Sequence, residues 1–462
     1  MLFNSPMFLF VFLPLAYAGF WRLESKQQRY VWLTFTGYAF YSFWDARFCA
    51  LMAFSTLVSY LAGRGLLAWK DPKRRKLCLV LPIVADLMLL GFFKYTNFAI
   101  SSAHSIAGWC GQSFSFPELG IILPVGISFY TFHTISYIVD AYRGTIVPTR
   151  NFFEFSCYVS LFSQLVAGPI VRFRQIEGDL EKIDRADWRA GLNIGWSFFV
   201  IGLIKKVLIA DTIALIIDPR LNEQVQLASG EAWLCMLGYT YQLYFDFSGY
   251  SDMAVGLGHL FGMKLPQNFD SPYKALNIAD FWRRWHISLS SCLRDYLYIP
   301  FGGGRGSKLL VNRNLLLTML IGGLWHGASW TFVIWGAYHG LLLVSYRQWG
   351  ALWDRMPRLL QRAGTFVLVV VGWAFFRANN LDSAFHILGS MFSWNGLGAE
   401  AFPISLFMLL GIGALIIHLF PNTFEVKHSW GLLPSISLGA LFVLCIIIVM
   451  GGDPSPFLYF QF

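Results

Sequence analysis

Charged side chains are scarce in this chain. Lys, Arg, Asp and Glu make up 13% of the 462 residues, whereas a soluble domain contains about 25%. Hydrophobic residues account for 56% of the sequence, and much of that share lies in runs long enough to cross a bilayer. This shortage of charge excludes an ordinary soluble protein and predicts an integral membrane protein.

Acidic residues are fewer than basic residues, and the chain carries a formal net charge of +9. Such an excess can indicate nucleic-acid binding. Here, however, the basic residues gather in short loops between apolar runs, as in cytoplasmic loops that face an anionic leaflet. We therefore expect membrane lipids, and no nucleic acid, as partners.

Close cysteine pairs are also missing. The seven cysteines are far apart and most lie in apolar runs, which argues against a disulfide framework and against a metal site. No basic region precedes the first apolar run, so a cleavable signal peptide is not expected. No tandem repeat or low-complexity linker divides the chain. We expect one membrane domain over 1–462, with a catalytic core at about 240–345.

The apolar runs predict an all-α polytopic membrane protein. Spans of ~20 residues give about 10–12 transmembrane helices, the last three near 364–376, 403–420 and 435–450. We expect them to surround a central cavity or tunnel, together with re-entrant and amphipathic helices. The stretch 151–170 contains the breaker Gly168-Pro169 and fits a re-entrant segment or a span. The polar but aromatic stretch 264–313 predicts amphipathic helices at, or dipping into, the cytoplasmic face.

Loop charge predicts the orientation. Basic loops follow residues 21 and 62, and two crossings separate them. The positive-inside rule therefore places both loops in the cytoplasm and the N-terminus outside. The loop that ends at Gly120 is poor in Lys and Arg, and we expect it on the external side.

Three of the nine histidines lie in the stretch 280–340: His286, His326 and His339. His326 is the only residue of 315–335 that titrates near neutral pH. An ionisable side chain at membrane depth is costly and is usually functional. The alternative is a structural histidine that is hydrogen-bonded inside a helix bundle. His286 follows Arg283 and Arg284, so headgroup binding is an alternative for it.

Long motifs in this part of the chain resemble the membrane-bound O-acyltransferase family. They are FWRRWHISLS (281–290), LRDYLYIPFGG (293–303) and LWHGASWTFVIWGAYHG (324–340). Further motifs agree in order: LPVGISFYTFHTISYIVDAYRG (123–144), QLVAGPIVRF (164–173), YQLYFDFSGYSDMA (241–254) and PFLYFQF (456–462). The resemblance is strongest to the bacterial branch that contains the membrane subunit of alginate O-acetylation, with peptidoglycan O-acetyltransferases and teichoic acid D-alanyltransferases as relatives. Cys292 departs from the tryptophan expected there.

The resemblance implies a catalytic histidine at His326 and a second functional histidine at His286. It also implies an acyl donor reached from the cytoplasm, an acceptor reached from outside, and a bacterial inner-membrane location. We expect acetyl-CoA as the donor substrate, with no bound cofactor and no metal. The expected partners are an extracytoplasmic or membrane-anchored acyltransferase and an exported polysaccharide such as alginate.

The residue types suit this chemistry. A neutral histidine can accept the proton of an attacking hydroxyl, so we assign His326 as general base. His286 either positions the acceptor or donates to the oxyanion, and the sequence leaves both roles open. Asp295 is expected to pair with Arg294 or a nearby arginine. The candidate cavity-lining residues are Trp325, Tyr250, Asp246, Gln164 and Asp295.

A basic set is the candidate site for the phosphates of the donor: Arg283, Arg284, Arg305 and Lys308. The neighbouring Gly302-Gly303-Gly304 leaves backbone amides open to anions. Contact with anionic lipid is the alternative for these side chains.

Two other functions remain open. Peptidoglycan O-acetylation or teichoic acid D-alanylation would use the same chemistry on another acceptor or acyl group. A transporter would use buried histidines and aspartates to relay protons or bind substrate. Transporters often show matched halves with broken helices, and this sequence shows no such symmetry.

Overall fold

The computed structural model describes residues 1–112, 117, 119–166, 168–222, 227–452, 455 and 457–458. Every regular element in these ranges is a helix, so the predicted all-α class is confirmed. Parts of three stretches discussed above lie outside the described residues: most of the motif 456–462, Ala167 of the motif 164–173, and 113–116 with 118 in the predicted external loop.

Four helical stretches are long and apolar enough to cross a membrane, judged by length and composition: Lys26–Ala68, Pro72–Trp109, Arg358–Arg377 and Leu432–Gly451. Phe8–Arg22 and Ile404–His418 are shorter apolar helices. The expected number of 10–12 crossings stays a prediction.

The chain divides into two compact units. One comprises Met1, Phe3–Leu192 and Leu257–Pro266, and the other comprises Leu2, Asn193–Gly256 and Gln267–Phe462. The single domain expected over 1–462 also stays a prediction.

The first unit contains eight whole α-helices among its described residues: α1 (Leu13–Arg22), α2 (Lys26–Asp45), α3 (Cys49–Ala68), α4 (Pro72–Leu90), α5 (Thr96–Trp109), α6 (Ile127–Arg143), α7 (Phe152–Ser160) and α8 (Phe173–Glu181). Local sequence sets where they start. Ser25 and Gln28 form a capping box before α2, and the Asp71 side chain caps α4, which begins with a proline.

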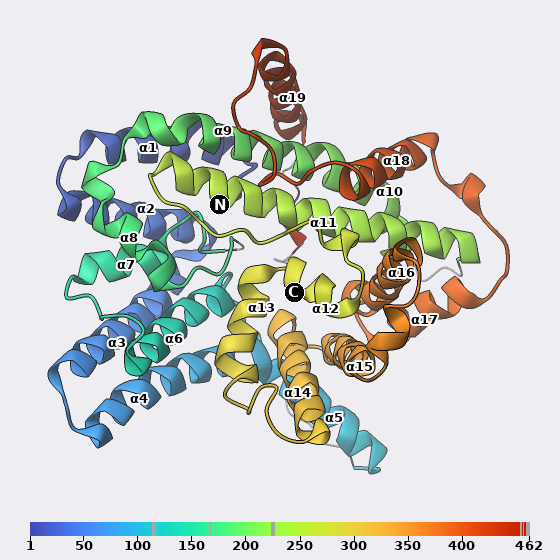
Figure 1. Cartoon of the computed structure of the whole chain (residues 1–462), viewed down its shortest axis with the longest axis horizontal. Helices are drawn as coiled ribbons and strands as arrows, with labels where there is room; N and C mark the ends of the chain where they lie inside the picture. The colour runs from blue at the N-terminus through green and yellow to red at the C-terminus, as the bar shows by residue number, and fades with distance from the viewer. Residues whose placement is uncertain are drawn as a thin grey trace. The chain divides into compact units, whose positions relative to one another are not determined.

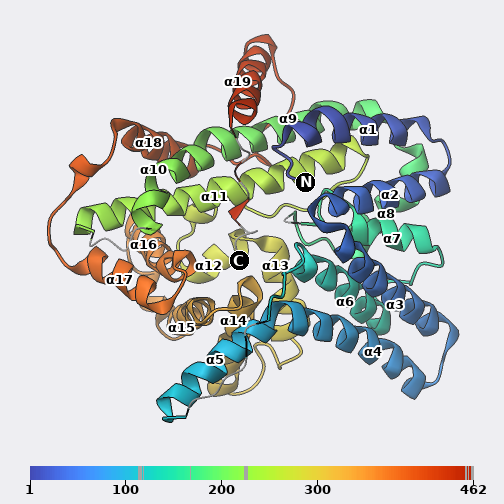
Figure 2. The ribbon, with the colours of Figure 1, turned by 180° about the vertical axis from the view of Figure 1, so that it is seen from behind.

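A buried carboxylate links three of these helices. Figure 2 shows α3, α4 and α6 side by side. Asp86 on α4 accepts hydrogen bonds from Ser55 on α3 and from Thr134 on α6, each at 2.6 Å. Inside a membrane, lipid is as apolar as the helix surface, so apolar burial does little to hold helices together. Hydrogen bonds such as these join them instead.

The stretch 151–170 does not form a spanning helix. Its helix α7 has nine residues and measures about 14 Å at 1.5 Å per residue, about half of the ~30 Å hydrocarbon core. A turn follows before Gly168-Pro169.

The second unit contains the remaining helices: most of α9 (Trp188–Ile204) and α11 (Ser229–Leu260), with α10 (Asp211–Asn222), α12 (Ile278–Arg284), α13 (Ile287–Leu293), α14 (Lys308–His326), α15 (Trp330–Trp353), α16 (Arg358–Arg377), α17 (Leu381–Phe392), α18 (Ile404–His418) and α19 (Leu432–Gly451). A π-helical segment, Lys205–Ala210, joins α9 to α10.

Glycines bring α9 and α11 into backbone contact. A Cβ atom on Gly202 would lie 2.4 Å from the carbonyl oxygen of Gly249, and one on Gly256 would lie 2.5 Å from that of Gly195. Small residues at such crossings let helices approach closely inside a membrane. Figure 1 shows α14 and α15 paired in the same unit.

The aromatic stretch 264–313 forms short helices. Helices α12 and α13 have seven residues each. Phe281 and Leu289 are buried, whereas the side chain of Arg283 is 70% exposed. The stretch is therefore two-sided, as the sequence indicates, and its inner side is packed within the protein.

Candidate active site

The two candidate histidines lie together in the second unit. His286 is the residue before α13 and His326 is the last residue of α14. Their ring centroids are 6.4 Å apart, and the two residues are 0% and 4% exposed respectively. The fold therefore brings together two positions that are distant in the sequence. We call these two residues the histidine pair.

The local sequence around His326, Gly322-Gly323-Leu-Trp-His-Gly327, predicts a glycine-flanked turn, but the structure forms a helix there. His326 ends a 19-residue helix, and Gly327 follows in an extended conformation. The glycines nearby allow α15 to approach closely: a Cβ atom on Gly323 would lie 2.2 Å from the carbonyl oxygen of Phe332. Helix packing therefore fixes where His326 lies.

Aromatic rings surround the histidine pair. The ring of His326 lies 5.1 Å from Trp325, 5.0 Å from Trp335 and 5.3 Å from Phe376, measured between centroids. The edge-on ring of Phe247 lies 4.7 Å from His286. Such surroundings exclude water and strengthen electrostatic interactions inside the site.

The backbone holds His286 in an uncommon conformation. Its φ of 45° and ψ of 55° lie in the left-handed region, which costs a residue other than glycine about 1–3 kcal/mol. The amide oxygen of Asn268 lies 3.1 Å from His286 Nδ1 and accepts a hydrogen bond from Ser288 N. The backbone oxygen of Asn268 accepts from Ile287 N at 2.9 Å. These contacts offset the strain.

Burial also fixes the charge of His286. This residue lies outside the helices long enough to span a membrane. Loss of solvent lowers its pKa from 6.5 to about 3, so the imidazole is neutral at physiological pH. Headgroup binding, the alternative role for this residue, does not fit a side chain with no exposed surface.

Asp246 on α11 belongs to a buried charge cluster. Its Oδ1 lies 2.5 Å from Lys206 Nζ, which also donates to Asp211 at 2.7 Å. Its Oδ2 accepts a hydrogen bond from Leu458 N at 3.1 Å. A lysine inside an apolar run must face protein, water or lipid headgroups, and Lys206 faces these two protein carboxylates.

Trp325 lies beside the histidine pair, and Tyr250 is connected to it through two aromatic rings. Tyr250 stacks on Phe457 at 4.8 Å, and Phe457 lies 5.5 Å from Phe247, the ring that packs on His286. Trp325 lies 6.2 Å from His286.

Asp295 and Gln164 have other surroundings. Arg294 donates to Asp295 at 2.7 Å, which confirms the expected pairing. Gln164 belongs to the first unit and donates to the carbonyl oxygen of Tyr158 at 2.5 Å. A cavity lined by these candidates stays a prediction.

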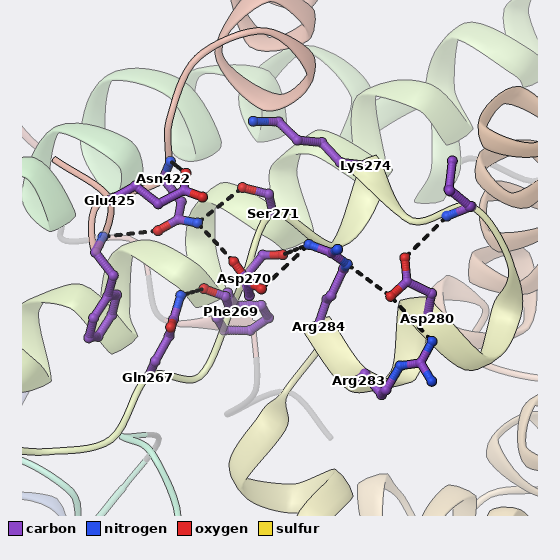
Figure 3. Close-up of polar contacts among 12 residues, drawn as sticks. Gln267, Phe269, Asp270, Ser271, Lys274, Asp280, Arg283, Arg284, Asn422 and Glu425 are labelled. Carbon is purple, nitrogen blue, oxygen red and sulfur yellow. Dashed lines mark hydrogen bonds and ion pairs between the residues drawn. The ribbon is translucent and has the colours of Figure 1, made fainter. Parts of the chain in front are cut away.

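The basic set divides by exposure. Figure 3 shows Arg284 between two carboxylates, with its Nε 3.1 Å from Asp280 and its Nη1 3.4 Å from Asp270. Asn422 donates to the same Asp270 at 3.1 Å. The side chain of Arg284 is 33% exposed, against 70% for Arg283. Arg284 therefore holds the loop before α12.

The remaining members of the basic set are open to solvent. Arg305 and Lys308 are exposed, and Lys308 is the first residue of α14. Gly302 and Gly303, with φ of 113° and 58°, take left-handed conformations that favour glycine. Arg283, Arg305 and Lys308 are thus the exposed members of the basic set, whereas Arg284 is held between two carboxylates.

Sequence reasoning missed Asn268 and Phe376, which contact the histidine pair. Asn268 lies in a polar stretch without periodicity, and Phe376 lies in an ordinary apolar run. Nothing in a single sequence distinguishes these two residues from their neighbours.

No group of three or more His, Cys, Asp or Glu side chains suited to a metal ion occurs in the described ranges.

The model of the membrane-bound O-acyltransferase family matches residues 146–385, which include both histidines. The chain belongs to the membrane-bound O-acyltransferase family. It is therefore a multi-pass membrane acyltransferase.

Several curated members of this family are similar over most of their length. A probable alginate O-acetylase of Pseudomonas aeruginosa is 44% identical over 402 residues, or 85% of this chain and 75% of that protein. A probable alginate O-acetylase of Pseudomonas putida is 41% identical over the whole of both chains. A peptidoglycan O-acetyltransferase of Helicobacter pylori is 39% identical over 86% of this chain and 81% of that protein.

Proposed function

We propose that this acyltransferase moves an acetyl group from cytoplasmic acetyl-CoA across the inner membrane for O-acetylation of an exported polysaccharide such as alginate. The observation that carries the proposal is the buried histidine pair, with ring centroids 6.4 Å apart. Relatives at 41–44% identity are named for alginate O-acetylation, which supports this acceptor.

In this proposal His326 is the general base. It takes the proton of the attacking hydroxyl while the hydroxyl oxygen forms a bond to the thioester carbonyl. The carbon–sulfur bond then breaks, and the proton passes from His326 to the departing thiolate. Proton transfer by a positioned histidine accelerates such a step by about 10²–10⁴-fold.

The donor enters from the side that carries the basic set. Arg283, Arg305 and Lys308 are exposed and would hold the phosphates of coenzyme A in water. Anionic lipid is the alternative ligand for these side chains. If they bind only lipid, their replacement should not change how the transfer rate depends on donor concentration.

The final acceptor is reached outside the membrane with the help of a partner acyltransferase, anchored or extracytoplasmic. Peptidoglycan O-acetylation is the second candidate, because the relative from Helicobacter pylori carries that name. D-alanyl transfer would use another acyl group with the same pair of histidines.

The test uses the purified protein in liposomes, together with the partner acyltransferase and the polysaccharide acceptor. Radioactive acetyl-CoA is added outside in one sample and a D-alanyl thioester in a parallel sample. Transfer of the acetyl group to the partner or the polysaccharide that depends on His326 supports the proposal. Transfer from the D-alanyl thioester alone excludes acetyl-CoA as the donor. The gene is also deleted in cells. If acetyl groups are then lost from alginate, alginate is the acceptor. If they are lost from peptidoglycan alone, the second candidate function is correct.

A further inference from the structure

Asn268 contacts His286 and the residue two positions after it through its side-chain amide. Asn268 is fully buried, and its Oδ1 lies near three donors or acceptors on the segment that carries the histidine. The distances are 2.8 Å to Ser288 Oγ, 3.1 Å to His286 Nδ1 and 3.2 Å to Ser288 N.

The orientation of the Asn268 amide follows from one of these contacts. The backbone N–H of Ser288 can only donate, so the Asn268 atom that faces it is the carbonyl oxygen and not the NH₂ group. A flipped amide would place two donors against each other. The same oxygen therefore faces His286 Nδ1.

The tautomer of His286 follows in turn. An amide oxygen only accepts hydrogen bonds, so Nδ1 of His286 carries the proton and donates it. Ser288 Oγ lies 3.5 Å from Nδ1 but 2.8 Å from the amide oxygen, so its hydroxyl donates to Asn268. In the neutral ring the other nitrogen, Nε2, then carries the lone pair.

We propose that Asn268 is a positioning residue that holds His286 as the Nδ1–H tautomer, so that Nε2 accepts a hydrogen bond from the hydroxyl of the acyl acceptor. This inference rests on the proposed function and decides between the two roles that the sequence leaves open for His286. A neutral ring whose only N–H is donated to Asn268 has no proton for an oxyanion. His286 thus orients the hydroxyl, and His326 takes its proton.

The first measurement is the tautomer itself. ¹⁵N spectra of histidine-labelled full-length protein in lipid nanodiscs are compared with those of His286→Gln, which identifies the signals of His286. The expected wild-type signals are a protonated Nδ1 and an unprotonated Nε2. A protonated Nε2 in the wild-type protein overturns the inference, even if acetyl transfer is intact.

Three variants separate positioning from a purely structural role. Asn268→Leu keeps the volume but removes the acceptor, and it is expected to allow the Nε2–H form. Forcing a catalytic histidine into the wrong tautomer can cost ~10⁴-fold in kcat, and here we expect a loss of at least about tenfold. Asn268→Asp keeps the acceptor and should restore the tautomer and most of the rate. Ser291→Ala, which removes a hydroxyl on the same helix that donates to the carbonyl oxygen of Ser288, is the matched control and should retain the tautomer and the rate.

The outcomes are distinct. Loss of rate in Asn268→Leu with the Nδ1–H signal unchanged contradicts the inference, because the effect is then structural. If Asn268→Leu fails to fold, the tautomers of the wild type and of Asn268→Asp decide the question. These signals are read without acyl donor or acceptor, so their result is independent of whether acetyl-CoA and alginate are the substrates.

Discussion

At the scale of single residues, exposure separates basic side chains that look alike in the sequence. Arg283 and Arg284 are neighbours, yet only Arg284 lies between two carboxylates, those of Asp270 and Asp280. Among the described residues, Arg283 pairs with Asp280 alone, at 3.5 Å, and 70% of its side chain is exposed. Arg284 therefore holds the loop before α12, whereas most of the Arg283 side chain stays accessible.

Replacement of each arginine by alanine should have different effects. Arg283→Ala is expected to raise the KM for acetyl-CoA about two- to tenfold, the net value of one ordinary hydrogen bond of ~0.5–1.5 kcal/mol, without a change in thermal stability. Arg284→Ala should lower the thermal midpoint. The measurement is donor-dependent transfer alongside a melting curve. Equal effects of the two variants on both quantities would show that the exposure difference has no functional meaning.

The burial of His286 predicts a pH dependence of stability. Its pKa is about 3 in the folded protein against 6.5 ordinarily, so the unfolded chain binds a proton between these values and the folded protein does not. Stability therefore falls as the pH falls below about 6.5, by at most ~1.4 kcal/mol per pH unit from this group.

His286→Gln should reduce this acid sensitivity. The drop in thermal midpoint from pH 7 to pH 5 is expected to be smaller in His286→Gln than in the wild type. His386→Gln, which replaces an exposed histidine, is the control and should retain the wild-type drop. An identical drop in all three proteins would mean that His286 is not buried as a neutral group.

The residues differ in how far the sequence could predict them. His286 and His326 are found through long motifs, and the meeting of their rings follows from the chemistry those motifs imply. Asn268 is 18 residues from His286, and Asn422 is 152 residues from Asp270. Pairings over such separations depend on the folded backbone, which no local pattern encodes.

At the scale of elements, glycines set how α14 and α15 pack. The hairpin brings Gly323 against the backbone of Phe332, and three residues later α14 ends at His326. The apolar runs near 364–376, 403–420 and 435–450 were expected as helices, and α16, α18 and α19 confirm them. The ends of the seven-residue helices α12 and α13 could not be predicted from the sequence. Their apolar residues are placed according to which positions are buried in an irregular packing surface, so they show no helical period.

The hairpin makes a matched pair of glycine variants informative. In Gly323→Ala the new methyl group would lie 2.2 Å from a backbone oxygen, so α15 must shift and His326 with it. In Gly322→Ala the nearest atom is 3.0 Å away at the end of the flexible Leu293 side chain. We expect Gly323→Ala to lose at least about tenfold in transfer rate, given the precision that positioned groups require. Gly322→Ala should remain within about twofold. Equal activity of the two variants would contradict this packing.

At the scale of the whole molecule, the orientation in the membrane decides which face the donor reaches. The family and the apolar helices establish a multi-pass membrane protein. The cytoplasmic position of the basic loops and the external N-terminus are predictions from loop charge.

Cysteine labelling in intact cells tests this orientation. Cys110 is exposed and lies in the loop expected outside, so a membrane-impermeant maleimide should label it. In a variant in which Ser replaces Cys110, Lys73→Cys should be labelled only after the cells are opened. External labelling at position 73 would reverse the orientation and place the basic set away from cytoplasmic acetyl-CoA.

The account depends most directly on the histidine pair, and single-turnover acetyl transfer by purified protein in liposomes tests it. His326→Ala should lower the rate about 10²–10⁴-fold, the contribution of a general base, and His286→Ala should lower it by a smaller factor. Both variants should fold and insert as the wild type does. A folded His326→Ala protein that transfers acetyl groups at the wild-type rate would contradict the central claim.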